Sequence, residues 1–175
     1  MKKIILFGGI HGTGKNFILN EIKKHLNINI FSASDLIKMY SNSYSDIDKK
    51  VDNISLNQEY LIKAINRFIN DELFILNGHF CLLDNNYNIV KIDKDIFVKL
   101  NLYKIILLTE NIDIIQNRLK SRDNILLDYS ILDKFQNTEK EYAKEISELL
   151  NNLPLKIFKY SNIENIYDII DFIEK

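Results

Sequence analysis

The stretch KKIILFGGIHGTGKNFILNEI, residues 2–22, decides how the rest of the chain is interpreted. It contains a short apolar run, then a glycine-rich turn, then apolar side chains at helical spacing. Gly9 is followed by four residues and then by Gly14 and Lys15, which is the spacing of a phosphate-binding P-loop. A strand before the loop and a helix after it are the required context, so this stretch predicts nucleotide binding. A chance glycine-rich turn between a strand and a helix is the alternative.

A loop of this kind binds phosphate through its backbone. Glycines let the N–H groups wrap around the phosphate, and the start of the following helix adds partial positive charge. Lys15 is placed to reach the β- and γ-phosphates, so we predict it to be catalytic. The residues expected to contact the nucleotide are Gly9, His11, Gly12, Thr13, Gly14, Lys15 and Asn16.

The residue after the lysine departs from the usual pattern. Its hydroxyl normally ligates Mg²⁺, and here the residue is Asn16. An amide oxygen is also a magnesium ligand, but a longer side chain changes the geometry. The second metal group is expected at the end of a central strand, where the sequence has Asn77 instead of an acid. The sequence therefore predicts ATP and Mg²⁺ as cofactors, with Asn16 as a metal ligand and with weakened metal binding.

The composition of the chain narrows the class of protein. Its 175 residues are 46% hydrophobic and 27% charged, which predicts one domain, residues 1–175, with a substantial core. A formal net charge of -1 indicates neither a nucleic-acid nor a membrane surface, and no segment has the roughly 20 apolar residues that span a bilayer. The single cysteine, Cys81, is expected to be buried, and a cytoplasmic location fits its lack of a disulfide partner.

Short apolar runs alternate with helical patterns along the chain. Five runs are apolar on both faces, as parallel strands covered by helices must be; they are residues 3–9, 28–33, 73–78, 103–109 and 155–160. Helical spacing is found over residues 14–26, 56–70, 112–120, 129–151 and 163–174. This alternation predicts an α/β, three-layer P-loop NTPase fold, with a five-stranded parallel sheet in the order 2-3-1-4-5 and helices on both faces. Residues 80–92 interrupt the rhythm and predict a β-hairpin.

Five segments together resemble an adenylate kinase-type nucleoside monophosphate kinase, most of all the small archaeal-type enzymes and their ribosome-assembly relatives. The segments are GGIHGTGKN (8–16), FSASDLIK (31–38), ILNGHF (75–80), LLTENIDIIQNRLKSRD (107–123) and FQNTEKEYA (135–143). They follow the order of the family and extend over most of the chain. The second segment keeps Asp35 but has Lys38 where the family has Arg. The third keeps His79 but has Asn77 where the family has Asp.

The resemblance implies an ATP-dependent phosphotransferase that moves the γ-phosphate of ATP to a nucleoside monophosphate or a similar small acceptor. Arg118 and Arg122 lie four residues apart, on one face of a helix, and would clamp the transferring group, so we predict both as catalytic. Surface pairing with Asp123 or Asp128 is the alternative. The residues predicted to bind substrate are Asp35, Lys38, Asn77, His79 and Gln136.

Several of these substrate residues have a second interpretation. Asp35 is as consistent with capping a helix over 36–41 as with binding the acceptor. Lys38 can hold a phosphate only as a point charge, and His79 is either structural or orients a phosphate. The acceptor-binding insertion is expected at about 36–72, and a short lid without cysteine pairs, hence without zinc, at about 121–132.

The same fold allows other functions. A kinase of this type could act on a nucleoside, a sugar or a nucleic-acid end. Alternatively, an ATP-binding protein with weak ATPase activity would act through a protein partner, which Asn16 and Asn77 favour and the two arginines disfavour. We do not expect a GTPase, because no Asn-Lys-x-Asp or Asp-x-x-Gly motif follows the loop. An AAA motor is also unexpected, because no helical lid domain follows in the sequence.

Overall fold

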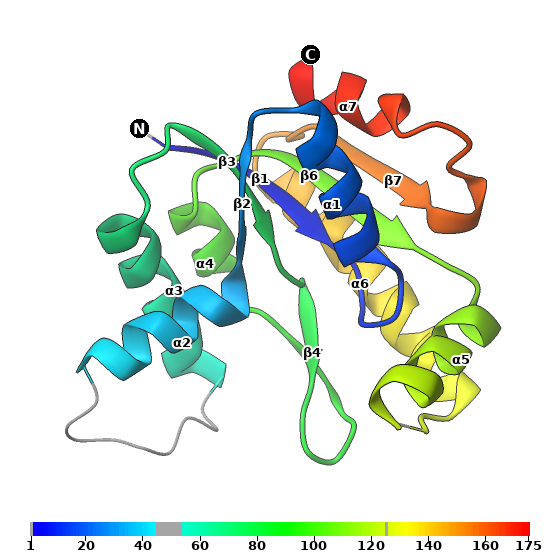
Figure 1. Ribbon diagram of the computed structural model, residues 1–175. Helices are drawn as coiled ribbons and strands as arrows, with labels where there is room; N and C mark the ends of the chain where they lie inside the picture. Colours follow the sequence, from blue (N-terminus) through cyan, green and yellow to red (C-terminus); the bar gives the residue numbers. More distant parts are fainter. Residues whose placement is uncertain (1, 45–53, 125) are drawn as a thin grey trace.

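A five-stranded parallel sheet forms the centre of the computed structural model, which describes residues 2–44, 54–124 and 126–175 (Figure 1). Its strands are β1 (Lys3–Gly8), β2 (Asn29–Ser32), β3 (Leu73–Asn77), β6 (Leu102–Thr109) and β7 (Leu155–Lys159). Every hydrogen-bonded pair of neighbours in this sheet is parallel. The expected α/β class and five-stranded parallel sheet are therefore confirmed.

The strand order in the structure is β2-β3-β1-β6-β7. These labels differ from the expected 2-3-1-4-5, because that numbering counted only the five strands of the large sheet. The hairpin strands β4 (Cys81–Leu83) and β5 (Ile89–Lys91) come between β3 and β6 in the chain and form a separate antiparallel sheet. The fourth and fifth strands of the expected numbering correspond to β6 and β7, and the hairpin expected over 80–92 is confirmed.

Two hydrophobic clusters, one on each face, explain why the strands lack polar alternation. In β1, Ile4 and Leu6 belong to one cluster, while Ile5 and Phe7 belong to the other. Side chains of a strand point alternately to the two faces of a sheet. A strand covered on both faces must therefore be apolar at every position, as the sequence of β1 is.

Helices cover both faces of the sheet (Figure 1). The helices α1 (Lys15–His25) and α7 (Tyr167–Glu174) pack on one face. The other face carries α3 (Ile54–Phe68), α4 (Lys94–Lys99), α5 (Ile112–Asp123) and α6 (Tyr129–Leu149). A further helix, α2 (Ala33–Tyr44), lies beside α3 at the β2 edge of the sheet. This is the expected three-layer arrangement.

Three helices differ from the expectation. Helix α2 begins at Ala33 rather than at residue 36, so Asp35 lies in its first turn and is not its cap; the backbone N–H of Asp35 instead donates to Ser32 Oγ at 3.4 Å. Helix α4 was not expected, because six residues are too few to show a helical period. Helix α7 begins at Tyr167 rather than at residue 163, because a 3-10 turn, Tyr160–Asn162, follows β7.

The expected insertion and lid are only partly visible. Most of α2 and all of α3 lie within the insertion expected at 36–72, whose loop residues 45–53 are outside the described residues. The expected lid at 121–132 is largely helical, since α5 continues to Asp123 and α6 begins at Tyr129. Residues 124–128 connect α5 to α6, which begins where the long helix was expected. The role of this segment as a lid stays a prediction.

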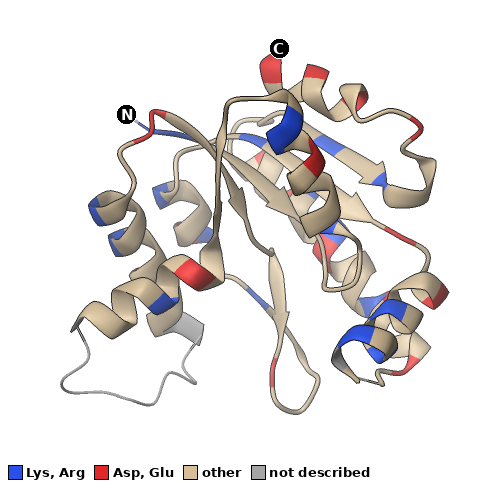
Figure 2. Ribbon diagram, viewed as in Figure 1, with Lys and Arg blue, Asp and Glu red and all other residues tan. Residues whose placement is uncertain are grey.

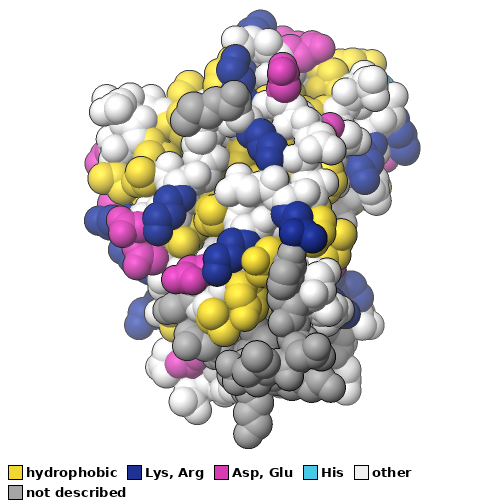
Figure 3. Space-filling model, turned by 90° about the vertical axis from the view of Figure 1, so that its left-hand side faces the viewer, with side chains coloured by type: hydrophobic (Ala, Val, Ile, Leu, Met, Phe, Trp, Pro, Cys, Tyr) yellow, Lys and Arg dark blue, Asp and Glu magenta, His cyan; other side chains and the backbone are white. Residues whose placement is uncertain are grey.

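Charges of both signs occur on the surface of the described residues. Acidic and basic residues are spread over the helices (Figure 2), and charged side chains stand among hydrophobic ones on the face formed by α2 and α3 (Figure 3). Within the described residues, no helix combines the length and apolarity needed to cross a membrane. Cys81 is buried with a free thiol, as expected, and burial raises its pKa to about 12.

Candidate functional site

The P-loop connects the end of β1 to the start of α1 through a tight backbone path. Gly9, Gly12 and Gly14 have φ angles of 133°, 86° and 99°, in the region that favours glycine. A Cβ atom on Gly9 would lie 2.4 Å from the carbonyl oxygen of Leu108, so no larger residue fits there. Thr13 is fully buried, and its Oγ1 donates to the carbonyl of Ile10 at 2.9 Å, which closes the loop.

The start of α1 is open to an anion. Its N-cap residue, Gly14, has no side chain to accept a hydrogen bond from the first turn, and that turn contains no acidic residue. The first backbone N–H groups of a helix lack intrahelical partners and carry the positive end of the helix dipole. A phosphate placed here would accept these hydrogen bonds.

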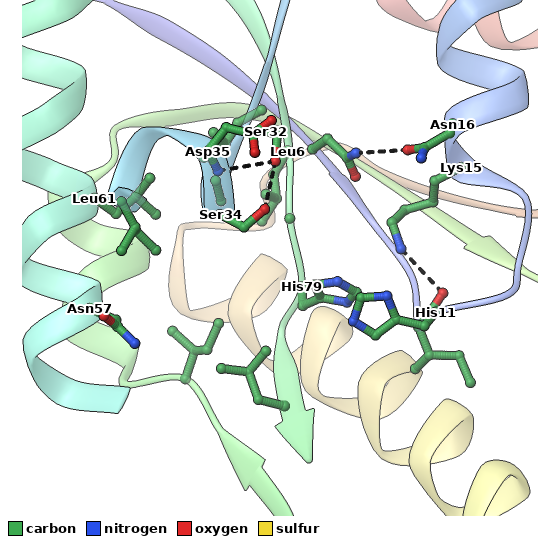
Figure 4. A pocket seen from close by; sticks show the side chains of 18 of the residues that line it. Leu6, His11, Lys15, Asn16, Ser32, Ser34, Asp35, Asn57, Leu61 and His79 are labelled. Atoms are coloured by element: carbon green, nitrogen blue, oxygen red, sulfur yellow. Dashed lines mark hydrogen bonds between the residues drawn. The ribbon is translucent and has the colours of Figure 1, made fainter. Parts of the chain in front are cut away.

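Lys15 is buried at the base of the loop, with 8% of its surface exposed. Its Nζ donates to the carbonyl oxygens of Gly9 and Ile10, so the side chain folds back onto its own loop (Figure 4). Burial lowers the pKa of Lys15 to about 8; the Glu139 charge opposes this shift and the Arg122 charge adds to it. The lysine is therefore held beside the phosphate position, with carbonyl groups as its partners.

A glutamate that sequence reasoning missed lies beneath the loop. Glu139, from α6, is 1% exposed and accepts backbone hydrogen bonds from Gly9 at 3.3 Å, Phe80 at 3.0 Å and Cys81 at 2.6 Å. Burial raises the pKa of its carboxyl group to about 7, while these N–H groups and Lys15 oppose the shift. Glu139 thus ties α6 to the P-loop and to the start of the hairpin.

The sequence does contain a signal for this glutamate. Apart from Ser147 near its end, the buried side of α6 is otherwise apolar, and Glu139 falls in the middle of it. The neighbouring buried residues along the helix are Leu132, Phe135, Tyr142, Ala143 and Ile146. An acidic residue inside an apolar helical stripe indicates a buried carboxylate that has specific partners.

Two histidines lie side by side at the mouth of the loop. The ring centroids of His11 and His79 are 4.6 Å apart, and both side chains line the cavity described below (Figure 4). Burial, together with the charges of Lys15 and His11, lowers the pKa of His79 well below its ordinary value. His79 Nδ1 is buried without a hydrogen-bond partner. His79 is therefore a neutral imidazole whose buried Nδ1 lies 3.9 Å from Glu139 Oε1.

The structure brings the two predicted metal positions together as an amide pair. Asn77 Nδ2, at the end of β3, donates to Asn16 Oδ1, at the start of α1, at 3.3 Å (Figure 4). The oxygen predicted to ligate Mg²⁺ therefore accepts an N–H group, and neither side chain carries a charge. Among the described residues, no group of three or more His, Cys, Asp or Glu side chains could hold a metal ion. Two neutral amides that bind each other supply no charged ligand for a magnesium ion. The metal role expected for Asn16 stays a prediction.

A cavity of about 1080 Å³ opens beside the P-loop. Residues from α1, α2, α3, β3, the hairpin and α4 line it. The predicted site residues that line it are His11, Gly12, Thr13, Gly14, Lys15, Asn16, Asp35, Lys38, Asn77, His79 and Arg122. Most of the residues singled out in the sequence thus come together around one space.

The two arginines expected to form a clamp are separated. Arg122 lines the cavity. Arg118 instead donates from Nη1 to the carbonyl of Gly12 at 3.0 Å, and its guanidinium lies 4.5 Å from the ring centroid of Tyr160. Its Nη2 is also 3.8 Å from Glu110 Oε2. In this structure Arg118 supports the outer side of the P-loop rather than facing the cavity.

Gln136, expected to contact nucleotide, has a structural role here. Its Oε1 accepts from the backbone N–H of Glu110 at 2.9 Å, and its Nε2 donates to the carbonyl of the same residue at 2.8 Å. Both halves of the amide therefore hold the chain where β6 ends. Gln136 is not among the residues that line the cavity.

The side of the cavity opposite the P-loop has a polar part and an apolar part. Ser32, Ser34, Asp35 and Lys38, at the junction of β2 and α2, form the polar part. The apolar part is lined by Leu61, Leu82, Ile92, Ile96, Phe97 and Leu100.

Asn57, which sequence reasoning missed, also lines this side. Its Oδ1 is buried and has no hydrogen-bond partner. A buried acceptor without a partner is unusual in a native fold, which makes it a candidate contact for a ligand.

Comparisons with known proteins agree with this fold. A family model described as an AAA domain matches residues 8–128. An uncharacterized protein from Eubacterium ventriosum ATCC 27560 is 16% identical, with a TM-score of 0.50 and 99% of each chain covered. A gluconokinase from Sinorhizobium meliloti 1021 is 14% identical, with a TM-score of 0.51, covering 97% of this chain and 87% of that one. At these identities the two structures show the fold alone. No curated protein matches the sequence.

The family match covers the P-loop, β3, β6 and α5, and thereby most of the candidate site. It places the chain among P-loop proteins, while the closer likeness to adenylate kinase-type enzymes remains a prediction. AAA proteins include the motors that were not expected here from the sequence. After β7, the described chain continues with a 3-10 turn and α7 rather than with a bundle of helices. Because the match covers more than half of the 175 residues, the chain belongs to the AAA domain family of P-loop proteins.

Proposed function

We propose that this protein is an ATP-dependent phosphotransferase that moves the γ-phosphate of ATP to a small acceptor, most favourably a nucleoside monophosphate. One observation carries the proposal. Lys15, Lys38 and Arg122, from three different helices, line the same cavity beside an open helix start. Three cations around one space suit a pair of phosphorylated ligands better than a single bound nucleotide.

The chemistry requires positioning and charge stabilisation rather than a covalent step. The loop N–H groups and the start of α1 would hold the donor phosphates. Lys15 would exchange the carbonyls of Gly9 and Ile10 for the outer phosphate oxygens. Arg122 would stabilise the negative charge that spreads over the transferring group.

The acceptor would bind on the opposite side of the cavity. Lys38 offers a point charge for its phosphate, and the neutral His79 offers a hydrogen bond to the attacking oxygen. The apolar walls and the unpartnered Asn57 Oδ1 favour a flat, largely apolar group that carries an N–H donor. A nucleobase meets this description, whereas a polyhydroxylated acceptor would leave hydroxyl groups unpaired against apolar side chains.

A second function remains open for a specific reason. The Asn16–Asn77 amide pair takes the place of the hydroxyl and carboxylate that usually serve metal-dependent transfer. This replacement favours an ATP-binding protein with weak ATPase activity that acts through a protein partner.

The test is ADP formation from ATP in the presence of Mg²⁺, with a panel of nucleoside monophosphates and nucleosides. We expect one acceptor to raise ADP release many-fold, and Lys15→Ala to lower that rate by at least about 100-fold, since it removes a cation from the transferring group. Lys23→Ala is the matched control, because Lys23 lies on the same helix and is exposed. If ATP binds but no acceptor raises turnover, the second function replaces the first.

A further inference from the structure

We infer that the phosphate end of the cavity binds ATP without a magnesium ion held by the protein, so that adding Mg²⁺ does not increase the affinity for ATP. This inference rests on the nucleotide binding of the proposed function. It concerns the form of the nucleotide that the site selects.

The two amides at the expected metal position are hydrogen-bonded to each other. Asn77 Nδ2 donates to Asn16 Oδ1 at 3.3 Å, directly beside the P-loop lysine (Figure 4). For Asn16 to ligate a cation, its oxygen would have to give up this hydrogen bond. The Asn77 amide would then present a partly positive NH₂ group toward the cation. The pair thus stabilises itself and disfavours a metal at the same place.

The cavity also has few carboxylates that could hold a magnesium ion. Mg²⁺ in nucleotide sites is usually held by one or two carboxylates together with the substrate phosphates. Among the described residues that line the cavity, the acidic side chain is Asp35, which lies on α2, an element separate from the P-loop and β3. Glu139 lies closer to the loop but accepts hydrogen bonds from three backbone N–H groups. Within the described residues, neither carboxylate is hydrogen-bonded to the amide pair.

The positive side chains of the cavity favour the more negatively charged form of ATP. Among the described residues that line the cavity, Lys15, Lys38 and Arg122 stand against the carboxylate of Asp35. Glu139 adds a second carboxyl group that acts on Lys15 from beneath the loop. Free ATP carries two more negative charges than its magnesium complex, so these cations gain more from the free form. In most P-loop sites the protein ligands of the metal offset this difference, and here those ligands are neutral amides that bind each other.

The experiment is calorimetric titration of ATP into the protein, once with EDTA and once with excess Mg²⁺. For the wild-type protein we expect that the dissociation constant of ATP in Mg²⁺ is either within about threefold of the value in EDTA or larger than it. The variant Asn16→Thr/Asn77→Asp restores the hydroxyl and the carboxylate, so Mg²⁺ should tighten its ATP binding by about tenfold or more. Asn77→Asp alone, which keeps the shape of the side chain, should gain part of this response if the double variant does not fold.

The control is Asn20→Thr, which makes the same kind of change at an exposed position one turn further along α1. It should behave as the wild-type protein does. ATP binding that Mg²⁺ tightens about tenfold or more in the wild-type protein overturns this inference and leaves the proposed function intact. Absence of ATP binding under both conditions overturns the proposed function, and the inference with it.

Discussion

The two sides of the cavity use their polar groups in different ways. On the phosphate side, Thr13, Lys15 and Glu139 are buried, and each is hydrogen-bonded to the backbone of the loop or of its neighbours. On the acceptor side, Lys38 is exposed to solvent, and the Oδ1 atom of Asn57 is buried without a partner.

Polar groups that are hydrogen-bonded within the fold contribute to its stability, whereas a polar group without a partner in the fold is available to a ligand. Thr13 and Glu139 hold the loop in its tight path before a ligand arrives, while Lys15 would change its partners when a phosphate binds. The fold does not use the Oδ1 of Asn57, so a ligand is left to satisfy it. Substitutions on the phosphate side should therefore lower stability and binding together, whereas Asn57 should affect binding alone.

The largest effect is expected for Glu139→Ala. The variant leaves the buried N–H groups of Phe80 and Cys81 unpaired and removes the negative charge beside Lys15. Breaking a buried charge interaction and leaving its partners unsatisfied costs about 3–5 kcal/mol of unfolding free energy. Denaturant unfolding followed by circular dichroism measures this loss.

The matched control for that variant is Glu141→Ala, on the same helix. Glu141 is exposed and forms a surface ion pair with Lys144, at 3.0 Å. A surface pair of this kind contributes about 0–1 kcal/mol. If Glu139→Ala were no more destabilising than Glu141→Ala, the phosphate side would not depend on the buried carboxylate, and the contrast between the two sides would fail.

The P-loop itself was the part of the site that the sequence predicted most directly. The loop from Gly9 to Lys15 is contiguous, so its spacing and the apolar run before it indicate both its shape and its neighbours. The strands were found for a similar reason, because burial on both faces makes a strand apolar throughout. Patterns of this kind depend only on short segments of the chain, so the sequence is enough to predict them.

The features that were missed depend on contacts between distant segments. Helix α4 has six residues, too few for a period, and it becomes a wall of the cavity only because the hairpin returns the chain to α3. The contacts of Arg118 and Gln136 could not be predicted, because their partners, Gly12 and Glu110, lie 106 and 26 residues away; their predicted roles toward a ligand stay predictions. Spacing along a helix does not show which of its residues will face a cavity.

An intermediate effect is expected from the pH dependence of ATP binding. The pKa of Lys15 is lowered from its ordinary 10.5 to about 8, chiefly by burial, so the lysine is charged below pH 8 and loses its proton above it. Because a phosphate binds the charged form, ATP affinity should be highest below about pH 8 and fall up to about tenfold per pH unit above it. Calorimetric titration between pH 7 and pH 9.5 measures the profile (a range of roughly one unit below to 1.5 units above that pKa).

The variant Lys15→Arg tests the assignment of this profile. An arginine stays charged throughout the range, so its ATP affinity, although lower, should not decline above pH 8. The neighbours Glu139 and Arg122 act on the pKa of Lys15, and neither should gain or lose charge above pH 8, since the pKa of Glu139 is about 7. A flat profile for the wild-type protein would show that Lys15 keeps its proton, and that burial on the phosphate side is less complete than the structure indicates.

The smallest effect on stability is expected for two adjacent residues of α3. Gln58 Oε1 accepts from the backbone N–H of Asp93 at 3.4 Å, so Gln58→Ala should lower the unfolding free energy by about 1 kcal/mol. Asn57 Oδ1 has no partner, and Asn57→Ala removes a buried acceptor that the fold does not use. Since Ala also favours a helix, this variant should be as stable as the wild-type protein, to within about 0.5 kcal/mol.

Acceptor binding should rank the two variants in the opposite way: Asn57→Ala, the smaller change in stability, should have the larger effect on the KM for the acceptor. Asn57→Ala should raise the KM for the best nucleoside monophosphate of the panel by about 5–20-fold, because a hydrogen bond from the base is lost, with little change in kcat. Gln58→Ala should change that KM less, because Gln58 lines the same cavity but its Oε1 already accepts from the backbone of Asp93. If Asn57→Ala instead destabilised the protein and left KM unaltered, its amide would belong to the fold, and the two sides of the cavity would not differ in the way the structure indicates.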